Sequence, residues 1–70
     1  MANEDEQRTA VRDGFLNALA KFLEADRTGA ATTSQRSALA QARGIARRVL
    51  STAEYDEAVF QAFREAGIDP

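Results

Sequence analysis

The residues that could do chemistry in this 70-residue chain are arginines and carboxylates, because the sequence has neither histidine nor cysteine. The commonest metal ligands and proton carriers are therefore missing. Asp56 and Glu57 are adjacent and project from different sides of a helix, which does not suit an acid–base pair. The acidic run at residues 4–6 lacks the ligand spacing of a calcium loop. We expect no enzyme activity, no bound metal and no cofactor.

Four arginines stand in the middle of the chain, Arg36, Arg43, Arg47 and Arg48, where residues 28–53 hold no acid. This segment carries a formal charge of +4, between flanking segments of −2 and −4. At 100° per residue, Arg36, Arg43 and Arg47 fall within roughly 40° of each other on a helix. We call these three residues the arginine edge. Guanidinium groups offer planar pairs of donors that suit carboxylates or phosphates.

Three interpretations of the arginine edge remain open: contact with an acidic protein partner, contact with nucleic-acid phosphates, or pairing with acids of the flanking segments. A net charge of −2 argues against a globally basic nucleic-acid binder. In a helix-turn-helix, the start of the second helix enters the major groove. Here that start carries Glu54, Asp56 and Glu57, which would repel phosphate. The charge pattern therefore favours a protein partner.

Phe60 falls roughly 60° outside the apolar face formed by Val59 and Phe63, next to Asp56 on the helical wheel. An exposed phenylalanine bordered by charge is typical of an interface anchor. The alternative is that Phe60 folds over the end of the first helix and completes the core. We predict that Arg36, Arg43, Arg47, Arg48 and Phe60 form the partner-binding site.

A strip of small residues, Ser37, Ala40 and Gly44, lies round the same helix with Arg48 beside it. Small residues at these spacings allow a helix of another chain to approach closely. The alternative is an exposed face with few contacts. Gly44 in an exposed helix interior costs about 1 kcal/mol relative to alanine. The strip is therefore a candidate self-association surface.

Three amphipathic helices are predicted, at about residues 4–27, 33–50 and 53–66, within one domain spanning 1–70. Capping-box spacings at Asn3, Thr32 and Ser51 mark their starts, and Gly29 and Gly67 mark ends. The predicted core faces combine apolar residues at helical spacing. They are Val11, Phe15, Leu16, Leu19, Phe22 and Leu23, then Ala38, Leu39, Ala42, Ile45, Ala46, Val49 and Leu50, then Tyr55, Val59, Ala62, Phe63 and Ala66.

The pattern predicts an all-α fold, a small antiparallel three-helix bundle, or a larger bundle if two chains dimerise and pool their apolar faces. Apolar runs are too short to span a bilayer, and the acidic start does not resemble a secretory signal, so we expect a cytoplasmic protein without a membrane partner. The function expected is a non-enzymatic, regulatory protein-interaction module of adaptor or inhibitor type. A nucleic-acid-associated protein and a self-assembling structural subunit are the alternatives.

Overall fold

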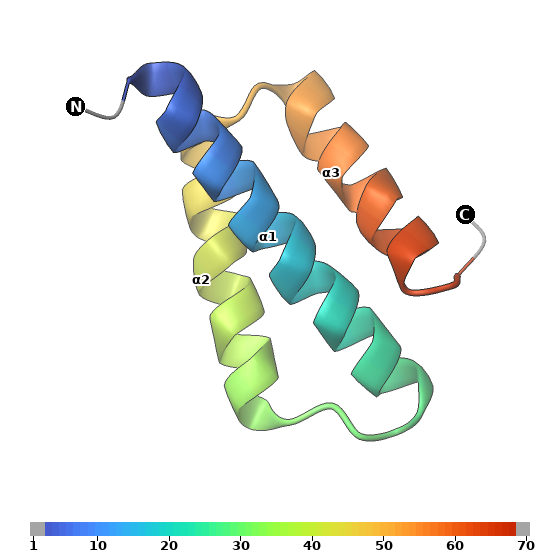
Figure 1. The fold of residues 1–70 in the computed structure, drawn as a ribbon. Helices are drawn as coiled ribbons and strands as arrows, with labels where there is room; N and C mark the ends of the chain where they lie inside the picture. Colours follow the sequence, from blue (N-terminus) through green and yellow to red (C-terminus); the bar gives the residue numbers. More distant parts are fainter. Residues whose placement is uncertain (1–2, 69–70) are drawn as a thin grey trace.

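The computed structural model describes residues 3–68, which form three α-helices and no strand (Figure 1). Helix α1 spans Glu4–Arg27, α2 spans Thr33–Val49 and α3 spans Thr52–Glu65. Their ends differ from the expected ranges by at most one residue. The predicted all-α three-helix bundle is confirmed.

The first two helices begin where their capping residues stand. The side chain of Asn3 accepts a hydrogen bond of 2.8 Å from the backbone N–H of Glu6. At the start of α2, the Thr32 hydroxyl accepts from the Gln35 backbone N–H at 3.1 Å, and the Gln35 side chain accepts from the Thr32 N–H at 2.9 Å. These bonds satisfy backbone donors that have no partner within the helix.

Helix α1 lies between the other two, and consecutive helices run antiparallel (Figure 1). Both α2 and α3 pack along α1, whereas they contact each other little, where the chain turns between them. The bundle is therefore organised around α1, and the sides of α2 and α3 that face away from α1 stay open.

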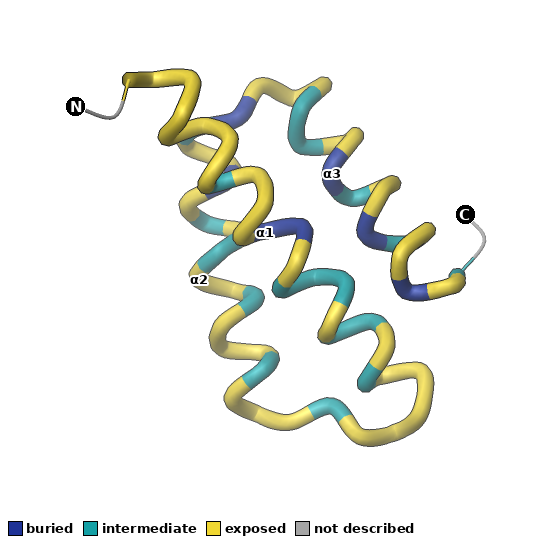
Figure 2. Tube along the Cα trace, viewed as in Figure 1, coloured by how far each residue is buried: buried dark blue, intermediate teal, exposed yellow. Residues whose placement is uncertain are grey.

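Only short stretches of the chain are buried (Figure 2). Alanine makes up much of this small core. Phe15 is 1% exposed and is the only large side chain among residues 3–68 that is fully buried. It clusters with Ala46, Leu50 and Ala58. Half-buried side chains surround this cluster, namely Val11, Leu19, Leu39, Ala42, Val49, Tyr55 and Val59.

Two residues predicted for the core are not there. Ala38 is exposed, and Ile45 is 50% exposed. Both lie at the edge of the apolar arc of α2, and because α2 packs mainly on α1, that edge has no second helix against it. Conversely, Ala58 was not predicted to be buried, yet it packs in the centre of the core.

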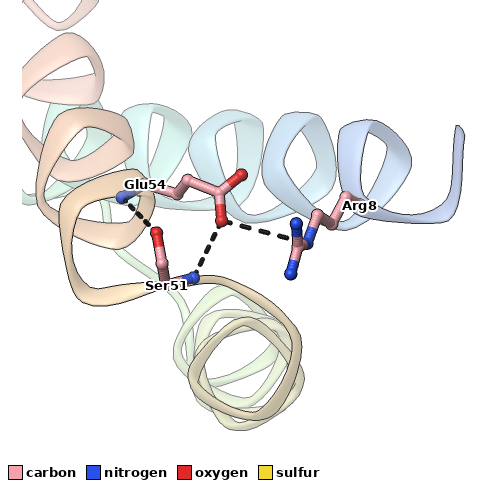
Figure 3. Close-up of polar contacts among 3 residues, drawn as sticks. All are labelled: Arg8, Ser51 and Glu54. Atoms are coloured by element: carbon pink, nitrogen blue, oxygen red, sulfur yellow. Dashed lines mark hydrogen bonds and ion pairs between the residues drawn. The ribbon is translucent and has the colours of Figure 1, made fainter. Parts of the chain in front are cut away.

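The corner between α2 and α3 is a second capping box (Figure 3). The Ser51 hydroxyl accepts from the Glu54 backbone N–H at 3.2 Å, and the Glu54 carboxylate accepts from the Ser51 N–H at 2.9 Å. The pKa of Glu54 is lowered chiefly by the hydrogen bond from the Ser51 backbone and next by the hydrogen bond with the Ser51 side chain. The charges of Arg8 and Arg12 lower it further, whereas desolvation opposes the shift. The Arg8 contact is a surface ion pair of 3.9 Å, which contributes little by itself.

Glycines occupy two different backbone conformations. Gly29 follows α1 with a φ of 75°, a left-handed conformation that costs other residues free energy. Gly44 lies inside α2 with helical geometry. A Cβ added at either position would meet nothing within 4 Å. Backbone conformation, not space, therefore decides the effect of a side chain at both sites.

We predict opposite effects of alanine at these two glycines. Gly44→Ala should raise the free energy of unfolding by about 0.5–1 kcal/mol, since alanine is the better helix former. Gly29→Ala should lower it by about 1 kcal/mol, since the left-handed conformation penalises a Cβ. For a domain of this size, about 1 kcal/mol shifts the Tm by roughly 4–8 °C. Thermal unfolding followed by circular dichroism measures both, and shifts of the same sign would contradict this account.

We also predict that the corner weakens in acid. Because the pKa of Glu54 is lowered in the folded state, its carboxylate stabilises the fold fully above the ordinary glutamate pKa, and this contribution is lost as the pH falls through the folded-state pKa. Glu54→Gln keeps an acceptor for the Ser51 N–H but removes the titration. The stability lost in urea unfolding between neutral pH and about pH 3 should be smaller in this variant than in the wild type.

The natural control is the capping box of α2, which already uses an uncharged residue, Gln35. Gln35→Glu should introduce the acid sensitivity that Glu54→Gln removes. An unchanged pH profile in both variants would show that neither box responds to titration.

Candidate functional site

The arginine edge forms as predicted on one side of α2. Arg36, Arg43 and Arg47 all lie within Thr33–Val49 and are exposed, so their helical spacing of seven and four residues keeps them in one strip. The strip adjoins the half-buried Leu39 and the buried Leu50. The edge is therefore a line of cations at the border of the core.

No carboxylate among residues 3–68 lies within 4.0 Å of a guanidinium nitrogen on α2. The ion pairs within that range join Arg8 to Glu54 at 3.9 Å and Arg12 to Asp13 at 3.3 Å. The interpretation in which acids of the flanking helices neutralise the arginine edge therefore finds no support in the described part of the chain.

The arginine edge instead contacts aromatic rings. The guanidinium carbon of Arg36 lies 5.9 Å from the ring centroid of Phe22 on α1, and that of Arg47 lies 5.8 Å from the ring of Tyr55 on α3. Tyr55 in turn stacks on Phe15, with ring centroids 4.9 Å apart and planes at 23°. The ends of the edge thus point towards the two other helices.

Arg36 and Arg47 are exposed, so their N–H donors remain accessible beside these rings. Sequence reasoning missed Phe22 and Tyr55 as the rings beneath them. The sequence feature that could have indicated these contacts is the position of the arginines beside Leu39 and Leu50, because it places their aliphatic chains at the edge of the core.

A hollow of about 300 Å³ lies at the corner beyond the arginine edge. Arg47, Leu50, Thr52, Tyr55 and Asp56 line it. Its walls combine one cation, one anion, two hydroxyl groups and apolar surface. Such mixed chemistry suits a polypeptide better than a uniformly anionic backbone.

Phe60 lies on α3 and outside the core. Its side chain is 51% exposed, so it does not fold over the end of α1 to complete the core. The guanidinium of Arg64, one turn along α3, lies 6.0 Å from its ring. Glu57, Gln61 and Glu65 join these two residues around a hollow of about 560 Å³. Phe60 is thus an exposed aromatic ring with charged and polar neighbours.

The predicted site residues fall into three groups. Arg36, Arg43 and Arg47 share the arginine edge, while Phe60 has Arg64, not the edge, as its cationic neighbour. Arg48 lies roughly 100° round the helix from Arg47. The predicted partner-binding site is therefore made of separate surfaces on α2 and α3.

The strip of small residues lies on the side of α2 that is turned away from α1. Ser37 and Ala40 are exposed, and the space around Gly44 is open, since an added Cβ would meet nothing within 4 Å. Within the chain no element approaches this strip closely enough to require glycine. Self-association through Ser37, Ala40 and Gly44 stays a prediction.

Residues 3–68 contain neither a cluster of metal ligands nor a helix suited to a membrane. No group of three acidic side chains there is placed to hold a metal ion. None of the three helices combines the length and the hydropathy required to cross a bilayer.

Comparison with protein-family models, with curated proteins and with solved structures gives no match. These comparisons therefore assign no function, and the functional proposal rests on the geometry of the surfaces of this chain.

Proposed function

We propose that this chain is a small non-enzymatic protein-interaction module, of adaptor or inhibitor type, whose arginine edge binds an acidic segment of a protein partner. One observation carries the proposal. The chain contains 11 carboxylate side chains, yet none among residues 3–68 lies within 4.0 Å of the arginines of α2. The arginine edge therefore keeps its capacity to pair with carboxylates of another molecule.

The position of Arg36 and Arg47 over aromatic rings supports this function. Binding is weakened by the entropy lost when long side chains are immobilised, about 0.5–1.5 kcal/mol for each. A side chain that already rests on an aromatic ring has lost part of that freedom before the partner arrives. The arginine edge is thus partly preorganised for bidentate contact with carboxylates.

The spacing of the arginine edge suggests the form of the partner. At a rise of about 1.5 Å per residue, Arg43 and Arg47 are about 6 Å apart along the axis, and Arg36 and Arg43 about 10.5 Å apart. A helix with acids four and seven residues apart matches both intervals. Its apolar residues would lie over the half-buried Leu39 and the hollow at the corner. We propose an acidic amphipathic helix as the bound segment.

Phe60 supplies a second contact in this proposal. Exposed aromatic rings bordered by charged groups are frequent anchors of interfaces. Arg64 above the ring and Glu57 and Glu65 beside it provide such a border. A partner that extends round the corner between α2 and α3 could engage both surfaces.

The same arginines could contact the phosphates of a nucleic acid, which is the alternative function. Asp56 beside Arg47 at the corner opposes this, as do the acids around Phe60, because they would repel a phosphate backbone. The proposed working environment is the cytoplasm, which suits a chain without cysteine.

Reversing two charges of the arginine edge tests the proposal. We expect the double variant Arg43→Glu, Arg47→Glu to lose the proteins that the wild-type chain captures from cell extract, as identified by mass spectrometry. Its helicity should persist, since the lost cation–π contact contributes only about 0.5–1 kcal/mol at an exposed site. The variant Arg43→Lys, Arg47→Lys keeps the charge but not the bidentate fork, and should retain weakened capture.

The matched control is Arg12→Glu with Lys21→Glu, the same charge change on exposed residues of α1. Capture should survive in this control. Equal loss in both double variants would mean that net charge, not the arginine edge, governs binding. Retention on DNA or RNA that falls steeply with salt would favour the nucleic-acid alternative.

A further inference from the structure

An apolar groove of about 430 Å³ runs along one side of the seam between α1 and α2. Most of its lining residues are small, with Ala10, Gly14 and Ala18 on α1 and Ala38 and Ala42 on α2, and Val11 and Phe15 of α1 also contribute. The spacing of four residues repeats along both helices, so the groove follows their axes. The groove is distinct from the arginine edge, because Arg43 lies roughly 160° round α2 from the groove residue Ile45.

Ile45 stands at the same groove and is 50% exposed. On the helical wheel it lies within roughly 20° of Ala38. A large apolar side chain and a hollow lined by small residues therefore occupy one face of the chain. Two copies related by a two-fold axis would each offer the side chain that fits the hollow of the other.

Gly14 gives a second reason to expect an occupant. Glycine in a helix interior costs about 1 kcal/mol relative to alanine. Packing within the chain does not require it, since an added Cβ would meet nothing within 4 Å. A side chain of another molecule that lies across Gly14 would account for this residue.

The exposed area of the chain is also larger than its mass predicts. Its accessible surface is 5042 Å² for 7.6 kDa. Scaling of area with mass gives about 4,300 Å², an excess of roughly 700 Å². A stable interface of standard size buries about 800 Å² on each partner. The excess is thus close to what one homodimer interface would cover.

We propose that the occupant of the groove is a second copy of this chain. The two-fold axis runs roughly parallel to α1 and α2, so α1 of each copy lies against α2 of the other. Ile45 of one copy then packs over Ala10 and Gly14 of the second. Two helices from each chain form a four-helix core, and both copies of α3 stay outside it.

Charges at the border of the groove agree with this arrangement. Glu6 precedes Ala10 by one turn, and Arg48 follows Ile45 by about one turn. Because Ala10 and Ile45 share the groove in antiparallel helices, Glu6 and Arg48 lie at the same end of it. An axis parallel to the helices preserves that height, and so brings Glu6 of one copy to Arg48 of the other. Opposite charges meet at both borders.

Sedimentation equilibrium from micromolar to millimolar protein tests the dimer. We expect the wild-type chain to dimerise within this range. Ile45→Gln should raise the dimer Kd by about tenfold or more, since two half-exposed isoleucines lose their burial. Gly14→Gln should weaken the dimer as well, by filling the groove while it favours the helix.

Phe60→Gln is the matched control, because Phe60 is 51% exposed, almost equal to Ile45, but lies on α3. Its dimer Kd should equal that of the wild type, as should that of Arg43→Glu, Arg47→Glu. The outcomes of this test and of partner capture are therefore independent. A monomer throughout the range, or equal weakening by Ile45→Gln and Phe60→Gln, would overturn the proposal. So would a dimer that neither Ile45→Gln nor Gly14→Gln affects.

Discussion

The side chain of Phe15 fixes how the three helices meet. It lies on α1 and is enclosed by Ala46 and Leu50 of the α2 end and Ala58 of α3, while Tyr55 stacks on its ring. The two alanines matter because their small side chains let α2 and α3 approach the ring closely. No other large side chain among residues 3–68 is fully buried. The relative position of all three helices therefore depends on one aromatic ring and the small residues around it.

A core of this size has consequences for the surface. A chain of 70 residues buries only about 60% of the area its unfolded form exposes, so several apolar side chains remain partly in contact with water. The arginines of α2 partly cover two of them, Phe22 and Tyr55. The same contact keeps the guanidinium groups beside these rings, which supports the binding proposed for the arginine edge.

Much of the local structure could be predicted from the sequence. Capping residues and terminal glycines act within a few residues, so the helix ends followed from spacing alone. The arginine edge could also be predicted, since helical periodicity fixes the angles between residues of one helix. Periodicity does not say which part of an apolar arc meets another helix. Ile45 and Ala38 were placed in the core for that reason, although α2 packs chiefly on α1 and leaves them open.

The burial of Ala58 was missed for a related reason. Alanine suits a core and a surface about equally well, and only its neighbours decide. The predicted bundle did not specify which pairs of helices pack together. In the structure, α1 makes almost all of the contacts between helices. That asymmetry depends on how α2 and α3 diverge from the corner at Ser51, which no local signal in the sequence encodes.

The divergence of α2 and α3 also affects which charges of the chain can pair with each other. Residues 28–53 carry +4 between two acidic segments, and pairing with the acids of α3 would require that helix to lie along the arginine edge of α2. Such ion pairs would contribute about 0–1 kcal/mol each at the surface. This is too little to change the angle between α2 and α3 that packing around Phe15 sets. Folding therefore leaves the arginine edge without carboxylate partners among residues 3–68 at small cost. A partner that brings acids and apolar surface together would gain more, because it would exclude water from the arginines and from the half-buried rings beneath them in one step.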